Sequence, residues 1–119
     1  VVLNGSASVR GNTATGYGGG GIHGGHGSVT QNRSASISGN AGAQNGGGYL
    51  GGGVLTMNGN SAIRNNTAEV GGGIMSGGDI VMNANSTVTG NTATVNTGGI
   101  DHRDGTRTGV GFPTTVETT

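Results

Sequence analysis

The sequence predicts an all-β fold, a right-handed parallel β-helix (solenoid) of about four coils of 25–28 residues with three short strands each. Four segments of the chain align without gaps, and apolar residues alternate with polar ones inside them as they do in strands. Strong helix formers are scarce, because the chain has no Lys and abounds in Gly, Asn, Ser and Thr. The right-handed path follows from the general rule for parallel crossover connections.

The aligned segments are VVLNGSASV, VTQNRSASI, LTMNGNSAI and IVMNANSTV. They begin at Val1, Val29, Leu55 and Ile80, so their starts lie 28, 26 and 25 residues apart. Periods of this length are typical of solenoids, in which each repeat buries its apolar face against the next. The repeats cover approximately residues 1–28, 29–54, 55–79 and 80–105.

Two positions of the repeat always hold asparagine. In a parallel stack, equivalent residues lie above one another, so their amides can pass hydrogen bonds along the axis and satisfy backbone groups at tight bends. We therefore expect two structural asparagine ladders, Asn4, Asn32, Asn58 and Asn83, and Asn12, Asn40, Asn66 and Asn91.

Each repeat should hold one strand ending at its first asparagine, one around a β-branched residue, and one running through a glycine cluster to Ile or Tyr. The expected core residues are Val9, Ile37, Ile63, Val88, Ile22, Tyr49, Ile74 and Ile100. The glycines have two available roles. They allow positive φ at corners, and they let another backbone approach closely.

Residues 106–119 depart from the repeat. The segment offers one further strand, from Thr106 to Val110, and it contains the only Phe and the only Pro. A degenerate C-terminal cap, with Phe112 over the last coil and Pro113 ending strand pairing, and an unrelated linker both fit this segment.

Composition excludes several classes of function. Charged residues make up 8% of the chain and the formal net charge is zero, so we expect no nucleic-acid partner. No apolar run is long enough for membrane insertion, no secretion signal is visible, and no Cys is present to form a disulfide framework. Because the chain begins without Met, in strand-like VVLN, we interpret it as a mature or excised piece.

Candidate cofactor and metal sites are weak. GYGGGG and GGGIHG match spaced-glycine nucleotide motifs, but no helix or ribose-binding acid follows, so no cofactor is expected. His23 and His26 lie in the first connector, while His102, Asp101 and Asp104 lie in the fourth. Three coils separate the two groups by roughly 14 Å, too far to share one metal ion.

An enzyme alternative rests on two carboxylates. Asp79 and Asp104 occupy similar places in consecutive connectors, about 5 Å apart by strand spacing, as in a retaining glycosidase. Arg103 and Arg107 would hold an acidic sugar. A third partner and an aromatic platform are missing, since Tyr17 and Tyr49 stand far along the chain. We therefore expect solvated turn acids and no catalytic residues.

Two surface motifs do not indicate a function. The TAT triplets at 13–15 and 92–94 suggest an ice-binding threonine array, but AGA at 41–43 and TAE at 67–69 interrupt it. Asn-x-Ser/Thr sequons at Asn4, Asn32, Asn65 and Asn85 are explained by the abundance of these residue types.

The segments VRGNTATGYGGGGI, ISGNAGAQNGGGY, IRNNTAEVGGGI and VTGNTATVNTGGI share one pattern. It resembles the repeats of the chlamydial polymorphic membrane proteins and of related autotransporter-like bacterial surface proteins, in which a short FxxN element precedes GGAI. Here Val or Ile stands for Phe, and Gly mostly stands for Ala, so the match is to the wider group. It covers residues 1 to about 105.

The resemblance implies a right-handed β-helix passenger segment, exported to the cell surface and used in adhesion or surface architecture, with no catalytic residues to carry over. A stack of four coils has little core and two exposed ends. We therefore expect flanking repeats of a larger chain or end-to-end self-association into filaments. Any surface receptor is left unidentified.

Overall fold

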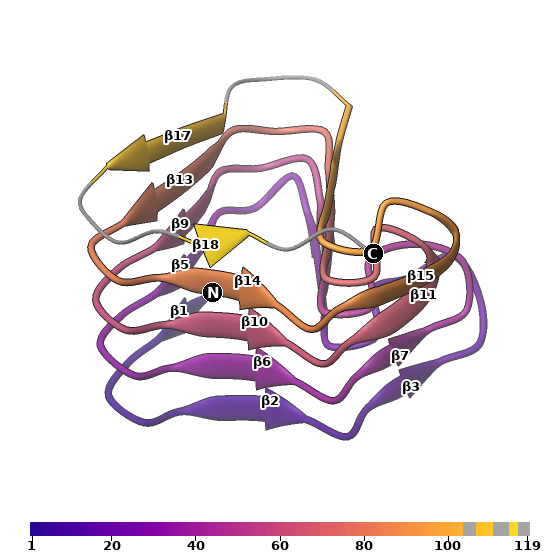
Figure 1. The fold of residues 1–119 in the computed structure, drawn as a ribbon, viewed down its shortest axis with the longest axis horizontal. Helices are drawn as coiled ribbons and strands as arrows, with labels where there is room; N and C mark the ends of the chain where they lie inside the picture. The colour runs from indigo at the N-terminus through magenta and orange to yellow at the C-terminus, as the bar shows by residue number, and fades with distance from the viewer. Residues whose placement is uncertain (104–106, 111–114, 117–119) are drawn as a thin grey trace.

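The computed structural model describes residues 1–103, 107–110 and 115–116 of the chain. It confirms the predicted fold class. The described residues form no helix, and every strand pair is parallel, stacked into a solenoid of about four coils. Figure 1 shows the coils rising from β2 at the bottom to β14, with equivalent strands directly above one another.

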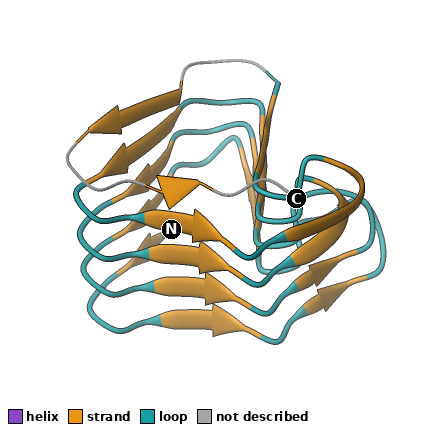
Figure 2. Ribbon diagram, viewed as in Figure 1, coloured by secondary structure: helices purple, strands orange, loops and turns teal. Residues whose placement is uncertain are grey.

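The strands form four sheets, here named A to D, and each sheet takes one strand from every coil (Figure 2). Sheet A contains β1 (Val2–Leu3), β5 (Val29–Gln31), β9 (Leu55–Met57), β13 (Ile80–Asn83) and β17 (Arg107–Val110). Sheet B contains β2 (Ser8–Arg10), β6 (Ser36–Ser38), β10 (Ala62–Arg64), β14 (Thr87–Thr89) and β18 (Thr115–Val116). Sheet C contains β3 (Thr13–Ala14), β7 (Ala41–Gly42), β11 (Thr67–Val70) and β15 (Thr92–Asn96). Sheet D contains β4 (Ile22–Gly25), β8 (Tyr49–Gly51), β12 (Ile74–Ser76) and β16 (Ile100–His102).

Each coil has four strands because the expected third strand is divided in two. The glycine cluster is not part of a strand. It forms the bend between sheet C and sheet D, where the chain reverses direction. A Cβ atom at Gly48 would lie 2.7 Å from the carbonyl oxygen of Gly73 in the next coil, and a Cβ atom at Gly47 would collide with the carbonyl oxygens of Gly72 and Thr67. At these two positions glycine is required by the close approach of other backbone.

The core fills the space between the sheets. Its fully or almost fully buried residues are Val29, Ile37, Tyr49, Leu55, Met57, Ile63, Ile74, Ile80, Met82, Val88 and Ile100. Alternation within each strand points every second residue inward, so Leu55 and Met57 are buried while Thr56 between them is half-buried. In the first coil Leu3, Val9 and Ile22 are only partly buried, because the described chain places no coil beneath them.

The backbone continues beyond the fourth coil. β17 pairs with β13 and β18 pairs with β14, both in parallel, so these segments extend sheets A and B. In this register Val110 stands beside Asn83, at the position that asparagine holds in every earlier coil. The expected cap residues Phe112 and Pro113 lie outside the described residues, as does Thr106, the first residue of the expected strand.

Candidate functional site

The first asparagine column lies at the corner between sheets A and B. The side-chain Nδ2 of Asn32 donates to Oδ1 of Asn4 at 2.8 Å, Asn58 donates to Asn32 at 2.8 Å, and Asn83 donates to Asn58 at 2.7 Å. Every amide therefore donates toward the N-terminal coil. Asn4 is exposed and the other three side chains are half-buried.

The second column lies at the corner between sheets B and C, and its hydrogen bonds run the opposite way. The backbone N–H and Nδ2 of Asn40 both donate to Oδ1 of Asn66, at 2.9 and 3.0 Å, and the same pair of bonds joins Asn12 to Asn40 and Asn66 to Asn91. Because a backbone N–H can only donate, the atom facing it must be the amide oxygen. The direction of this ladder is thereby fixed.

Asparagines of the second column also donate hydrogen bonds to backbone carbonyl oxygens of the preceding coil. Nδ2 of Asn40 donates to the carbonyl oxygen of Val9, and Asn66 and Asn91 make the equivalent bonds to Ile37 and Ile63, all at 3.0–3.1 Å. Asn40, Asn66 and Asn91 are at most 1% exposed. Buried polar groups are costly unless they are hydrogen-bonded, and here the amides are partners for one another and for the backbone.

Two corners of the repeat use left-handed backbone in every coil, and not all of these positions hold glycine. The residue after the first asparagine has positive φ in every coil, including Arg33 at 59° and Ala84 at 54°. The residue before the second asparagine does the same, with Asn65 at 55°. Asparagine tolerates this conformation better than alanine, which has no side-chain hydrogen bond to offset the steric cost.

A cationic groove lies on the outer side of the second corner. Arg10, Ser38 and Arg64 are consecutive residues of one outward column in sheet B, so the two arginines are two coils apart, about 9.6 Å by strand spacing. Together with the corner residues Gly11, Gly39 and Asn65 they line an open groove of about 490 Å³. Within the described part of the chain, neither guanidinium has an ion-pair partner. Guanidinium groups bind carboxylate, sulfate or phosphate oxygens in a bidentate manner, so this arrangement suits an extended anionic ligand.

Several of the candidate histidines and acids lie in strands of sheet D. His23 belongs to β4, and Asp101 and His102 belong to β16, so these three residues lie within strands rather than in connectors. β4 and β16 are the two outermost strands of sheet D, which separates the two groups. Across residues 1–103, no three His, Cys, Asp or Glu side chains come close enough to hold a metal ion.

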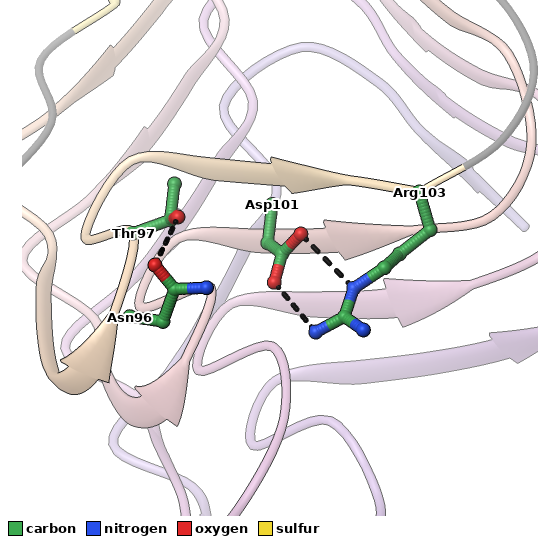
Figure 3. Close-up of polar contacts among 4 residues, drawn as sticks. All are labelled: Asn96, Thr97, Asp101 and Arg103. Carbon is green, nitrogen blue, oxygen red and sulfur yellow. Dashed lines mark hydrogen bonds and ion pairs between the residues drawn. The ribbon is translucent and has the colours of Figure 1, made fainter.

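Arg103 is engaged at the C-terminal end of sheet D. Figure 3 shows its guanidinium bound to both carboxylate oxygens of Asp101, with Nε–Oδ1 and Nη2–Oδ2 distances of 3.1 and 2.9 Å. The hydrogen bond and the charge of Asp101 raise the pKa of Arg103 above its ordinary value. Nearby, Thr97 donates its hydroxyl to Oδ1 of Asn96, and Nε2 of His102 lies 2.8 Å from the carbonyl oxygen of Gly78. Arg103 is thus held by a protein carboxylate.

The carboxylate pair of the enzyme alternative is only half described. Asp79 is half-buried in the turn before β13, whereas Asp104 lies outside the described residues, so the distance between them stays a prediction. The side chain of Arg107 is likewise outside the described part. Of the two tyrosines, Tyr17 is 75% exposed and Tyr49 is fully buried, so they do not form one surface.

Comparison of the chain with models of protein families, with curated proteins and with solved structures gives no match. In the described residues, no helix has the length and hydropathy needed to cross a membrane. The sequence did not single out the Arg10–Arg64 groove, although the shared column could be found by placing the aligned repeats above one another.

Proposed function

We propose that this chain is a structural β-solenoid segment of a secreted or cell-surface bacterial protein, acting in adhesion or surface architecture as part of a longer stack of coils. The observation that carries the proposal is the pair of asparagine ladders. They run without interruption through all four coils, from Asn4 to Asn83 and from Asn12 to Asn91. The amides of these asparagines bond to the equivalent residues of the next coil, so they hold successive coils in the same register.

The resemblance to autotransporter-like passenger repeats supports the location at the cell surface. Antibodies raised against the chain should label intact cells of the source organism, and external protease should remove the signal. Labelling that requires permeabilised cells would contradict the surface location. This experiment tests the location independently of any ligand.

The cationic groove gives an adhesive segment a surface for anionic polymers. Arg10 and Arg64 present two guanidinium groups along the axis of the solenoid, with the side chain of Ser38 between them. An acidic polysaccharide laid along the groove would meet both charges. Two exposed charges give weak binding for a single segment, and many segments in a stack would multiply it.

The binding test uses polygalacturonate, with neutral dextran as the uncharged polymer. The wild-type chain should be retarded in affinity electrophoresis through gels containing polygalacturonate, and the R10Q/R64Q double variant should lose most of that retardation. The matched control is R33Q, which removes an exposed arginine from the corner between sheets A and B. A loss in R33Q half as large as in the double variant, in proportion to one charge removed instead of two, would mean that only net charge matters and that the groove has no role in adhesion.

The enzyme alternative has its own test. A β-helix enzyme would depolymerise the polysaccharide that it binds, and Asp79→Asn would abolish the cleavage. Release of new reducing ends by the wild type, lost in the variant, would overturn the structural function in favour of a lyase or hydrolase.

A further inference from the structure

We infer that the N-terminal face of the solenoid is a docking surface for one specific occupant, a further coil with asparagine at both ladder positions, stacked head to tail. The N-terminal face is defined here as the free edges of β1, β2, β3 and β4 with the side chains of Asn4 and Asn12. The inference rests on the proposed function and names the partner that a solenoid segment requires.

Backbone hydrogen bonding at this face is incomplete in a regular way. In the second coil the N–H groups of Thr30, Asn32, Ser36 and Ala41 donate to carbonyl oxygens of the first coil, each at 2.9 Å. The corresponding N–H groups of the first coil belong to Val2, Asn4, Ser8 and Thr13, and they point away from the second coil. These groups belong to sheets A, B and C, and β4 is the terminal strand of sheet D, so all four strands of this coil present an unpaired edge, which favours addition of another strand.

The two ladders specify what that coil must carry. Because the first ladder donates toward the N-terminus, Nδ2 of Asn4 is an outward donor that requires an acceptor. Because the second ladder donates toward the C-terminus, Oδ1 of Asn12 is an outward acceptor that requires donors. An asparagine in the first column supplies the oxygen. An asparagine in the second column supplies its backbone N–H and Nδ2, as Asn40 does for Asn66.

The orientation follows from the shape of the coil. Head-to-tail stacking places the four strands of one coil over four strands with the same order and direction. Two N-terminal faces brought together by a two-fold axis would pair a strand with its own copy in antiparallel fashion, unlike the parallel pairing of every described strand pair. The buried apolar area also favours head-to-tail stacking, since it covers Leu3, Val9 and Ile22 together.

The C-terminal end of a second copy is a poorer occupant. There β17 extends sheet A and places Val110 beside Asn83, and valine has no amide to accept a hydrogen bond from Asn4. The inference therefore assigns the N-terminal face to a coil of the repeat type seen in the second and third coils. The end of an identical chain does not meet this requirement at the first ladder position.

The experiment adds that coil. A copy of residues 29–54 is joined directly before Val1, which preserves the junction at which Val54 precedes the next repeat. Hydrogen exchange is compared between the original and the extended chain. The amides of Val2, Asn4, Ser8 and Thr13 should exchange at least tenfold more slowly in the extended chain, and the thermal midpoint should rise. Unchanged exchange at these four amides would overturn the inference even if the cell-surface location held.

The ladder itself is tested by Asn4→Asp. A carboxylate at position 4 still accepts the hydrogen bond from Asn32 but removes the outward donor and opposes the oxygen of the added coil. The substitution should leave the midpoint of the original chain unchanged and cancel part of the gain in the extended chain. The control is Asn60→Asp, at an exposed turn residue outside both ladders, which should leave the gain intact. Loss of the same gain in both variants, or in neither, would contradict the ladder's role.

Sedimentation of the original chain at high concentration tests whether a second copy of the same chain can occupy the N-terminal face. A monomer agrees with a face reserved for a repeat coil. Filaments would show that the C-terminal end of a second copy is the occupant after all, and a closed dimer would show two-fold pairing of the N-terminal faces. Either result would overturn the inference.

Discussion

Asn66 is the residue on which the second ladder depends most. Its amide bonds to the carbonyl oxygen of Ile37 in the coil before and to Oδ1 of Asn91 in the coil after, and its own oxygen accepts from the backbone N–H of Asn40. Asn58 in the first ladder bonds only to other asparagine side chains and is half-buried. The two ladders therefore contribute unequally to stability.

Substitution of these residues by alanine should reveal the inequality. Asn66→Ala leaves the buried N–H of Asn40 without its partner and removes the amide bonds to Ile37 and Asn91, so the free energy of unfolding should fall by about 3 kcal/mol. Asn58→Ala, whose partners can turn to water, should cost about 1 kcal/mol. Urea denaturation measures both changes, and equal losses would contradict the separate roles of the ladders.

Among the described residues, Tyr49 is the one aromatic residue of the core. Its hydroxyl is buried and has no hydrogen-bond partner among the described residues, and burial raises its pKa above the ordinary value. The ring takes the space above Gly51, where a Cβ atom would collide with it, and a Cβ atom at Gly24 would lie 3.1 Å from the ring. Later coils carry Ile at this column, and there the residue corresponding to Gly51 is Ser76 or His102. The larger side chain in the second coil is thus matched by glycines beside it.

Tyr49→Phe removes a buried hydroxyl that nothing satisfies, so at pH 7 the free energy of unfolding should be unchanged or higher by about 1 kcal/mol. A raised pKa in the folded state means that folding favours the protonated phenol. Its contribution is complete below the ordinary pKa of about 10 and is lost as pH rises through the folded value. The wild type should therefore lose stability above about pH 10, and the variant should lose less.

The matched control for this pH dependence is Tyr17→Phe, which removes an exposed phenol. Urea denaturation at several pH values measures all three chains. If Tyr17→Phe relieved the alkaline loss as much as Tyr49→Phe does, burial of Tyr49 would not be its cause.

Among the elements, the sequence predicted the strands in which apolar and polar residues alternate. It did not predict that the third strand of each repeat is split between sheets C and D. The strands around Val9 and before Asn4 follow from alternation with period two. The split of the third strand into separate strands of sheets C and D does not follow, because glycine carries no side chain whose pattern could mark a bend. Only the contacts reveal that Gly47 and Gly48 are packed against the backbone of the next coil. The sequence pattern ends each strand at Ile22 or Ile100, whereas the strands continue past these residues and include His23 and Asp101.

The glycine bend predicts a sharp contrast between two alanine substitutions. Gly47→Ala forces a methyl group against the carbonyl oxygens of Gly72 and Thr67, so it should lower the free energy of unfolding by at least about 2 kcal/mol. Gly77→Ala adds a methyl group at an exposed position with nothing within 4 Å, and should change stability by less than about 0.5 kcal/mol. Thermal unfolding followed by circular dichroism compares them. A tolerated Gly47→Ala would remove the close-approach explanation of the glycine cluster.

For the whole molecule, the periodicity of the sequence predicted the stacked coils. It did not predict which side chains meet on the surface or in which direction the ladders donate. Alignment of four repeats is enough to derive stacked coils, because equivalent residues of a solenoid must lie above one another. The opposite directions of the two ladders, and the groove between Arg10 and Arg64, depend on which atoms face which neighbour. A pattern of residue types does not contain that information. The groove also joins residues from alternate coils, which no local motif would connect.

We expect the coils of this chain to be interchangeable. Insertion of a second copy of residues 55–79 immediately after Asp79, compared with insertion of residues 67–79 alone, tests this expectation. A whole extra coil continues both ladders and all four sheets, so the longer protein should keep the β-sheet circular dichroism spectrum and unfold at a higher temperature than the original. The half repeat breaks the register and should unfold the chain. If the whole-coil insertion unfolded the protein as the half repeat does, the account of this chain as a structural solenoid would be wrong.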